Sequence, residues 1–395
     1  MDKNGFFVVL CAMGLFAIFS STMSKNPVLP LFAESLGVPE HLMGFVAAAS
    51  TVPGILVSLP SGSLSDVFGR RRVLVTSEFI FASAPFVYIF VVSFSQLVLV
   101  RFYHGFATAV FGTVAIAAIV ETSPKNKAAR VATFSSTTMI GRGAAPFLGS
   151  YVLLITNSSY SSVYVSVGVA GIVTLLTGLA LYQLMSPRKG TGNQRREWID
   201  LSHLFRGWTR ITSNKGIVAT SLVESAMYFT FGAFEFFLVL YAESLGLDEL
   251  LIGIVMGAQL VAIMVTKPFM GKISDAYGRR KPVLVGMIAG GLPLIVTPFA
   301  TQFPELIALS IVYGLGLSAV TSSTTPLVSD LATKELQGAS IGFLRTFMDV
   351  GQALGPILTG FIVATAMGYF GAFIALGWIL LVFDIIFYWF TNDKS

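Results

Sequence analysis

Apolar runs of about 20 residues follow one another along almost the whole chain, separated by short polar segments. A helix of that length crosses the hydrocarbon layer of a bilayer. A soluble fold of 395 residues would need far more charge on its surface than the 11% found here. The runs also lack the alternation of apolar and polar residues that marks the strands of a membrane β-barrel. The chain is therefore expected to be an all-α integral membrane protein with twelve transmembrane helices. The predicted spans are residues 5–32, 41–63, 73–94, 97–120, 129–155, 161–185, 216–242, 249–270, 283–301, 304–329, 338–366 and 369–391.

Cations are distributed unevenly between the predicted loops. Of the 25 Lys and Arg residues, 20 lie in segments on the same side as the N-terminus, and the loops on the opposite side carry acids only. Because cytoplasmic loops are enriched in Lys and Arg, both termini are expected in the cytoplasm and the protein in an inner or plasma membrane. The net charge of +5 is attributed to this topology rather than to a nucleic-acid partner.

A loop motif occurs twice, 209 residues apart. Residues 62–72 and 271–281 each contain a Gly, an Asp four residues later, a Gly three further on and then three cations. Residues 31–37 also match residues 240–246 at the same offset, as Glu121 matches Asp330. A repeat of this length predicts two pseudo-symmetric six-helix bundles, residues 1–185 and 216–395. Residues 186–215 would form a cytoplasmic linker, either with an amphipathic helix at 198–205 or as a disordered tether.

Several classes of function are disfavoured by what the sequence lacks. The single cysteine, Cys11, and three scattered histidines give no metal-ligand spacing and no internal disulfide. No Walker loop and no nucleophile motif is present. The chain is therefore not expected to be an enzyme, to bind a metal or a cofactor, or to use ATP directly.

With its two related halves and its repeated loop, the chain resembles the major facilitator superfamily. Three stretches resemble the drug:proton antiporter branch of that family: 26–30, 101–105 and 141–149. His104 replaces the usual Gln of the second stretch, and the third lacks the usual Gly before Pro146, whereas 351–356 carries a fuller version. The antiporter-like residues are Pro27, Pro30, Gly105, Gly141, Pro146, Gly149, Gly355 and Pro356.

The resemblance implies transport by alternating access, driven by an ion gradient that is expected to be of protons. It also implies that the repeated loops form a conformational latch between the bundles, whereas a simple topology anchor would explain the arginines alone. The small Gly271 would permit close helix approach, and Gly278 a tight turn. The latch residues are Gly62, Asp66, Gly69, Arg70, Arg71, Gly271, Asp275, Gly278 and Arg279.

Ionisable residues inside the predicted spans are the main candidates for function, because each is costly in a membrane unless it is paired or hydrated. They are expected to line a polar cleft between the bundles. Arg345 and Asp349 are four residues apart and should pair on one helix face. Lys267 should extend to the inner surface, and Asp384 is not assigned a role. The candidates for substrate binding and proton coupling are Lys25, Glu78, Arg101, Arg142, Glu224, Glu235, Arg345 and Asp349.

A proton-coupled carrier needs a carboxyl that takes up and releases a proton in each cycle. Glu224 and Asp349 are the leading candidates, followed by Glu235 and Glu78, although each could instead be a paired structural charge. The phenylalanines of residues 229–237 could bind a lipophilic cation, or could simply pack. The glycines and prolines of spans 5 and 11 are expected to interrupt helix regularity and let the helices slide.

Three functions remain open from the sequence. The first is proton-coupled antiport that exports amphiphilic or drug-like small molecules. The second is proton-coupled uptake of an anionic or polar metabolite, which the intramembrane cations Lys25, Arg101, Arg142 and Arg345 would suit. The third is a non-transporting membrane receptor or enzyme. A monomer in the lipid bilayer is expected, with protons and a small-molecule substrate as its partners.

Overall fold

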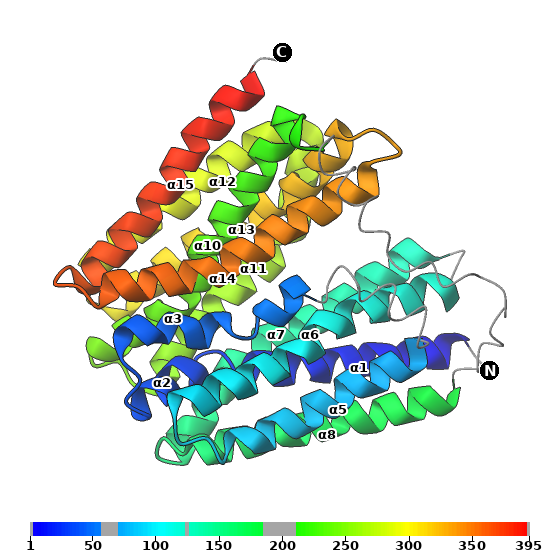
Figure 1. Ribbon diagram of the computed structural model, residues 1–395, viewed down its shortest axis with the longest axis vertical. Helices are drawn as coiled ribbons and strands as arrows, with labels where there is room; N and C mark the ends of the chain where they lie inside the picture. Colours follow the sequence, from blue (N-terminus) through cyan, green and yellow to red (C-terminus); the bar gives the residue numbers. More distant parts are fainter. Residues whose placement is uncertain (1–2, 57–69, 123–125, 185–210, 393–395) are drawn as a thin grey trace. The chain divides into compact units, whose positions relative to one another are not determined.

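The computed structural model describes residues 3–56, 70–122, 126–184 and 211–392, all of which form helices and the turns between them (Figure 1). Two compact units are formed, one from Met1–Val38 and Ala49–Ile199, the other from Pro39–Ala48 and Asp200–Ser395. The first unit contains α1 (Lys3–Met23), α2 (Val28–Ser35), α5 (Arg70–Tyr88), α6 (Phe94–Thr122), α7 (Lys127–Ile155) and α8 (Tyr160–Leu184). The second contains α3 (Glu40–Ala48), α10 (Lys215–Ser244), α11 (Glu249–Tyr277), α12 (Arg280–Val296), η1 (Thr297–Phe299), α13 (Phe303–Leu331), α14 (Gln337–Val363) and α15 (Gly368–Asn392).

Ten helices of the described chain are long and apolar enough to cross a membrane, counting α1 and α2 as one span. The predicted span 41–63 corresponds in part to α3, and its second half lies outside the described residues. The predicted span 73–94 corresponds to α5, which begins with three arginines and is less apolar than the others. The predicted linker helix at 198–205 also lies outside the described residues.

Equivalent helices pack in the same way in the two units. In the first unit α1 packs against α7 and α8, and α5 packs against α6 and α8. In the second unit the equivalent helix α10 packs against α14 and α15, and α12 packs against α13 and α15. The internal repeat of the sequence is therefore also a repeat of helix packing, in which each unit buries its own set of helix faces.

The repeat extends to backbone hydrogen bonds. Gly37 and Gly246, 209 residues apart, both have positive φ, +68° and +81°, and each follows the end of a helix. The Gly37 N–H donates to Glu34 O at 2.8 Å, and the Gly246 N–H donates to Glu243 O at 2.8 Å. Glycine adopts this left-handed conformation without steric penalty, so both turns depend on it.

Side chains at three turns of the second unit stabilise the start of the next helix. Asn214 accepts hydrogen bonds from the N–H groups of Gly216 and Ile217 at the start of α10. Asp248 accepts from Leu251 N–H at 2.8 Å and caps α11. Glu305 accepts from Gln302 N–H at 3.0 Å in the first turn of α13. The two acids, Asp248 and Glu305, therefore have a local role in capping helices, whichever side of the membrane they face.

Glycines bring the backbones of α10 and α14 close together. A Cβ atom at Gly355 of α14 would collide with the backbone of Phe229, and one at Gly232 of α10 would lie 2.7 Å from Gln352 O. In the first unit, a Cβ at Gly141 of α7 would lie 2.5 Å from Leu15 O of α1. Such small residues let membrane helices approach closely.

Spans 5 and 11 each keep a proline inside the helix. Helix α7 continues through Pro146, and α14 continues through Pro356. A proline removes the hydrogen bond to the carbonyl four residues earlier, which for Pro356 is Gln352 O. That carbonyl faces Gly232 of α10, where a close Cα–H can partly compensate for the missing donor. Tight packing thus holds the helix together across the proline.

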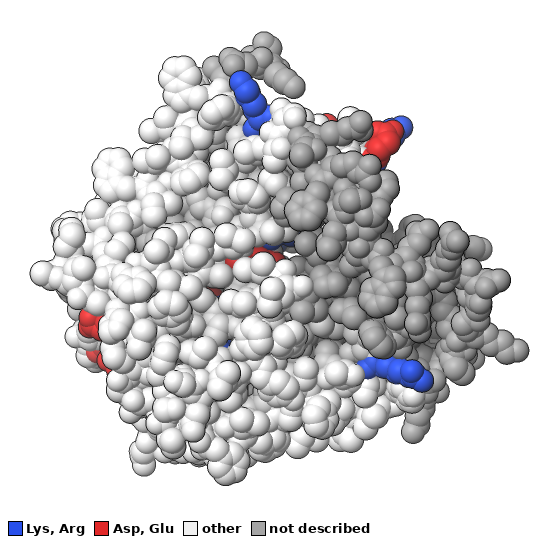
Figure 2. All heavy atoms as spheres, viewed as in Figure 1, with Lys and Arg blue, Asp and Glu red and all other residues white. Residues whose placement is uncertain are grey.

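Most of the described surface on the face shown in Figure 2 is uncharged. Large apolar side chains are exposed, among them Phe90 at 77%, Val92 at 75% and Trp378 at 57%. A soluble protein rarely exposes so much apolar surface, whereas a protein surrounded by lipid does so around its whole perimeter.

Candidate functional site

Arg101 lies on α6 of the first unit and is buried, with 3% of its surface exposed. Its guanidinium donates to Ser50 Oγ at 2.5 Å and to Tyr88 Oη at 3.5 Å. Gly105 lies one turn later, and a Cβ there would collide with the Ser50 backbone. Gly105 therefore lets the Ser50 backbone approach α6 closely, and the Ser50 hydroxyl accepts a hydrogen bond from Arg101.

Aromatic rings surround this arginine. Tyr88 stacks on Tyr164 of α8 with ring centroids 4.4 Å apart and planes 2° apart. His104 packs edge-on against Phe81 and Tyr88, and both of its ring nitrogens lack a hydrogen-bond partner among the described residues. The replacement of Gln by His at this position therefore puts a packed ring beside Arg101 rather than a hydrogen-bonding amide.

Glu78 of α5 is fully buried in the first unit. Both of its carboxyl oxygens lack a partner among the described residues. The carboxyl rests against Gly178 of α8, where a Cβ would overlap it. Burying a carboxyl without a hydrogen bond is unfavourable, so the Glu78 carboxyl beside Gly178 does not stabilise the folded unit.

Glu224 of α10 is the buried acid of the second unit with the clearest partners. It is 4% exposed, and its Oε2 accepts a hydrogen bond from Thr324 Oγ1 of α13 at 2.7 Å. Lys267 of α11 acts on it electrostatically. The hydrogen bond joins α10 to α13, and the expectation that Lys267 extends to the inner surface stays a prediction.

Glu235, three turns further along α10, is also 4% exposed. It acts electrostatically on Tyr313 of α13, whose hydroxyl forms a 3.0 Å hydrogen bond with Thr230. Phe234 packs on Tyr313 at 4.8 Å and on Phe373 at 5.8 Å. This phenylalanine of the 229–237 segment therefore packs within the unit and does not form an open aromatic surface.

The remaining charged candidates are more exposed. Arg142 of α7 and Arg345 of α14 are exposed, and Asp349 is half-buried. Arg345 acts electrostatically on Asp349, and a direct pair between them stays a prediction. Lys25 lies half-buried in the turn between α1 and α2, next to the Pro27 and Pro30 stretch, which occupies the turn and the first residues of α2.

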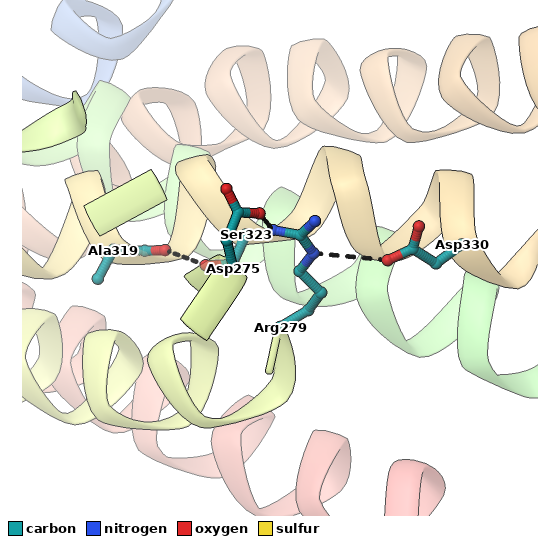
Figure 3. Close-up of polar contacts among 5 residues, drawn as sticks. All are labelled: Asp275, Arg279, Ala319, Ser323 and Asp330. Atoms are coloured by element: carbon teal, nitrogen blue, oxygen red, sulfur yellow. Dashed lines mark hydrogen bonds and ion pairs between the residues drawn. The ribbon is translucent and has the colours of Figure 1, made fainter. Parts of the chain in front are cut away.

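The second copy of the repeated loop forms an ion-pair network (Figure 3). Arg279 pairs with Asp275 at the end of α11, and its Nε donates to Asp330 Oδ2 of α13 at 3.5 Å. Gly278, between the two helices, has a φ of +87°, as the expected tight turn requires. A Cβ at Gly271 would meet no described atom within 4 Å, so within this unit Gly271 does not provide the expected close helix approach.

Most of the first copy of the loop lies outside the residues that the structure describes. Gly62, Asp66 and Gly69 lie outside the described residues, and Arg70 and Arg71 form the start of α5 without described side chains. Their role in a latch stays a prediction. The repeat matches Asp330 to Glu121, so the third member of the first network would be Glu121.

Partners that the sequence analysis did not identify are Ser50, Tyr88, Thr324 and Asp330. Only Asp330 left a signal in the sequence, through its repeat with Glu121. A threonine or tyrosine in an apolar span gives no indication of the charged residue that it contacts. A Cβ added at the antiporter-like Gly149 would lie within ordinary van der Waals distance of Met23 and Val28, so this position does not require a glycine for space.

Comparison with known proteins places this arrangement in a family. A sequence model described as the Major Facilitator Superfamily matches residues 10–248 and, in a second match, 220–395. A multi-drug resistance efflux pump PmrA homolog of Lactococcus lactis is 25% identical over 97% of this chain and 94% of its own length. The quinolone resistance protein NorA of Staphylococcus aureus is 23% identical over 88% of this chain and 87% of its own length.

Solved structures show the same fold. One is a bacterial homolog of the human lysosomal transporter Spinster in an inward-facing and unoccupied conformation, which superimposes with a TM-score of 0.83. The match covers 99% of this chain and 97% of the other, at 12% sequence identity. The nucleoside transporter NupG superimposes with a TM-score of 0.78, covers 100% of both chains and is 15% identical.

Proposed function

Because the chain belongs to the major facilitator superfamily, we propose that this secondary transporter is a proton-coupled antiporter that exports amphiphilic or drug-like small molecules. Family membership makes the chain a transporter of small molecules across a membrane and not an enzyme. The proposal adds the coupling ion, the direction and the class of substrate.

The observation that carries the proposal is the environment of Glu224. Its carboxyl is buried in a spanning helix, where a charge is costly unless a cation or a proton compensates it. Thr324 gives it one hydrogen bond, and Lys267 supplies a positive charge on a neighbouring helix. A carboxyl of this kind can exchange a nearby cation for a proton when its surroundings change. Such an exchange couples proton movement to a change of conformation or to a cationic substrate.

The export direction and the substrate class are supported by the relatives. Two of them are named as an efflux pump homolog and a quinolone resistance protein, and each covers most of this chain. The stretches 101–105 and 351–356 support this direction through their resemblance to the drug:proton antiporter branch. Arg101 would act in the same process as a buried cation.

The repeated loops complete the proposal as conformational latches. The Asp275–Arg279–Asp330 network would hold one state, and the first copy, with Asp66, Arg70 and Glu121, would do the same in the other half. In this proposal the halves 1–185 and 216–395 move as bundles joined by the linker 186–215. Both termini face the cytoplasm, and the transporter works as a monomer.

A transport assay with purified protein in liposomes tests the proposal. A panel of lipophilic cations, neutral drugs and carboxylates would be offered to vesicles with an acid interior and to vesicles with an acid exterior. Antiport predicts that lipophilic compounds accumulate in the acid-interior vesicles, and that Glu224→Gln abolishes this accumulation. Glu243→Gln, which changes an exposed acid at the far end of the same helix, is the matched control and should transport normally.

Accumulation of a carboxylate in the acid-exterior vesicles would instead identify the uptake carrier for an anionic metabolite. Buried Arg101 is the residue that would favour that second function, because its partners among the described residues are the neutral hydroxyls of Ser50 and Tyr88. Arg101→Gln should then abolish carboxylate transport.

A further inference from the structure

A pocket of about 930 Å³ lies in the second unit where the ends of four helices meet. Asn214 and Lys215 contribute from the start of α10, and Arg280 from the start of α12. Leu331 ends α13, and Trp389 lies in the last turn of α15. Asn214 Nδ2 donates to Leu331 O at 3.2 Å, which ties the start of α10 to the end of α13 along one wall. None of the residues proposed above to act in transport is among the described residues that line this pocket.

The pocket is positively charged. Among the described residues that line it, Lys215 and Arg280 are cations and none is an acid. Arg280 is held in place, because its Nη2 donates to Tyr388 O at 2.8 Å and its guanidinium lies 5.0 Å from the centre of the Tyr388 ring. The acids of the neighbouring network, Asp275 and Asp330, are engaged by Arg279. The charge that the pocket offers to a ligand is therefore positive.

The pocket also lies at the level where a membrane surface is expected. It borders the end of α15, where Tyr388, Trp389 and Phe390 are 47%, 69% and 51% exposed. Tyr and Trp gather where lipid headgroups meet the hydrocarbon layer. Leu331 and Phe390 give the pocket apolar lining beside its cations. An occupant that suits these walls is anionic at one end and apolar at the other.

We propose that this pocket binds the phosphate headgroup of an anionic phospholipid. Basic pockets between spanning helices recognise such headgroups, and guanidinium and ammonium groups both donate charge-assisted hydrogen bonds to phosphate oxygens. Lys215 and Arg280 contact the phosphate, while the glycerol backbone and the upper acyl chain lie against Leu331 and Phe390. The lipid thereby bridges α10, α12, α13 and α15, which are otherwise joined at this end by side-chain contacts.

Quenching of Trp389 fluorescence by brominated lipids tests the proposal without any transport assay. Trp198, Trp208 and Trp378 are replaced by Phe, so that Trp389 is the remaining tryptophan of the full-length protein. The protein is then placed in bilayers that mix phosphatidylcholine with either brominated phosphatidylglycerol or brominated phosphatidylcholine of the same chains. If the pocket binds an anionic headgroup, brominated phosphatidylglycerol should quench Trp389 more strongly than brominated phosphatidylcholine does. The relative binding constant should differ about fivefold or more, because one cation near an anionic surface contributes about fivefold to binding.

Lys215→Gln is the decisive variant, because Lys215 has no part in holding α15. It should reduce the preference for phosphatidylglycerol about fivefold, while Arg280 keeps the remainder. Lys334→Gln removes the same charge from an exposed residue just after α13 and should leave the preference unchanged. Arg280→Gln should also reduce the preference, and a normal melting temperature shows that α15 is still in place.

Two outcomes would overturn the proposal. Equal quenching by the two brominated lipids in the Trp389 protein would mean that the pocket has no preference for an anionic headgroup. A preference that inorganic phosphate removes, while chloride of the same ionic strength does not, would mean that the pocket takes a soluble phosphate and not a lipid.

Discussion

The carboxyl of Glu224 on α10 and the hydroxyl of Thr324 on α13 form a buried 2.7 Å hydrogen bond. At the 209-residue offset of the repeat, the corresponding residues of the first half are Leu15 and Ala115, which are both apolar. The two halves share a pattern of helix packing, but only the second carries a carboxyl at this position. We therefore attribute the proposed proton exchange to Glu224, a carboxyl that the repeat does not share with the first half.

Replacement of Thr324 by Ala should reduce transport that is driven by a pH gradient. Hydrogen bonds to charged groups contribute about 1.5–3 kcal/mol, so a loss of about 10-fold to 100-fold in the initial rate is expected. Thr324→Ser keeps the hydroxyl and should retain most of the rate. Thr321→Ala is the control, because Thr321 donates only to Leu317 O of its own helix. Equal rates for Thr324→Ala and the wild type would show that the hydrogen bond does not matter for transport.

Replacement of Gly355 by Ala should destabilise the second unit. The added Cβ would collide with the Phe229 backbone, and overpacking of this kind costs about 1–3 kcal/mol. Gly342→Ala on the same helix is the matched control, because a Cβ there meets open space, and Ala favours a helix over Gly by about 0.5–1 kcal/mol. Thermal unfolding in detergent should thus show a lower melting temperature for Gly355→Ala and an equal or higher one for Gly342→Ala.

Replacement of Glu78 by Met should stabilise the first unit. The Glu78 carboxyl is fully buried and has no hydrogen bond to any residue that the structure describes, which costs about 1–3 kcal/mol. Met287 occupies the equivalent position of the second half and is fully buried, so the fold accepts this side chain there. A higher melting temperature with transport retained would assign Glu78 no part in coupling. Loss of transport in Glu78→Met and in Glu78→Gln would make it a coupling residue.

Replacement of Asp330 by Asn should slow turnover without weakening substrate binding or stability. The ion pairs of Arg279 are exposed, with Asp330 at 61%, so each contributes only about 0.2–1 kcal/mol to stability. A latch acts on the balance between two conformations, where even a small energy changes the rate of exchange. Glu335→Gln, a nearby exposed acid, is the control. Asp66→Asn should behave like Asp330→Asn, and loss of binding together with turnover in either variant would contradict the latch.

The sequence predicted the fold because apolar length and a long repeat are strong signals. The all-α membrane fold is confirmed, with ten candidate spans in the part of the chain that the structure describes, and so is the resemblance to the major facilitator superfamily. The motif glycines Gly105, Gly141 and Gly355 were identified as well, although the reason they matter, close backbone contact, appears only in the structure.

The site was harder to predict, because the partners of charged residues come from other helices. Arg101 and Glu224 stand out as charges in apolar runs, but Ser50, Tyr88 and Thr324 do not, since hydroxyl residues are common in membrane helices. The predicted spans 129–155 and 338–366 correspond to α7 and α14, each of which contains its proline within the helix.

Proton and substrate movement measured in the same vesicles test the central claim most directly. Liposomes with an acid interior would hold a trapped pH-sensitive dye, and a lipophilic cation such as ethidium would be added outside. We predict that ethidium accumulates while the interior becomes alkaline, and that Glu224→Gln abolishes both changes but keeps the exchange of labelled for unlabelled ethidium. Ethidium entry that acidifies the interior, or an unchanged proton response in Glu224→Gln, would contradict proton-coupled export through this carboxyl.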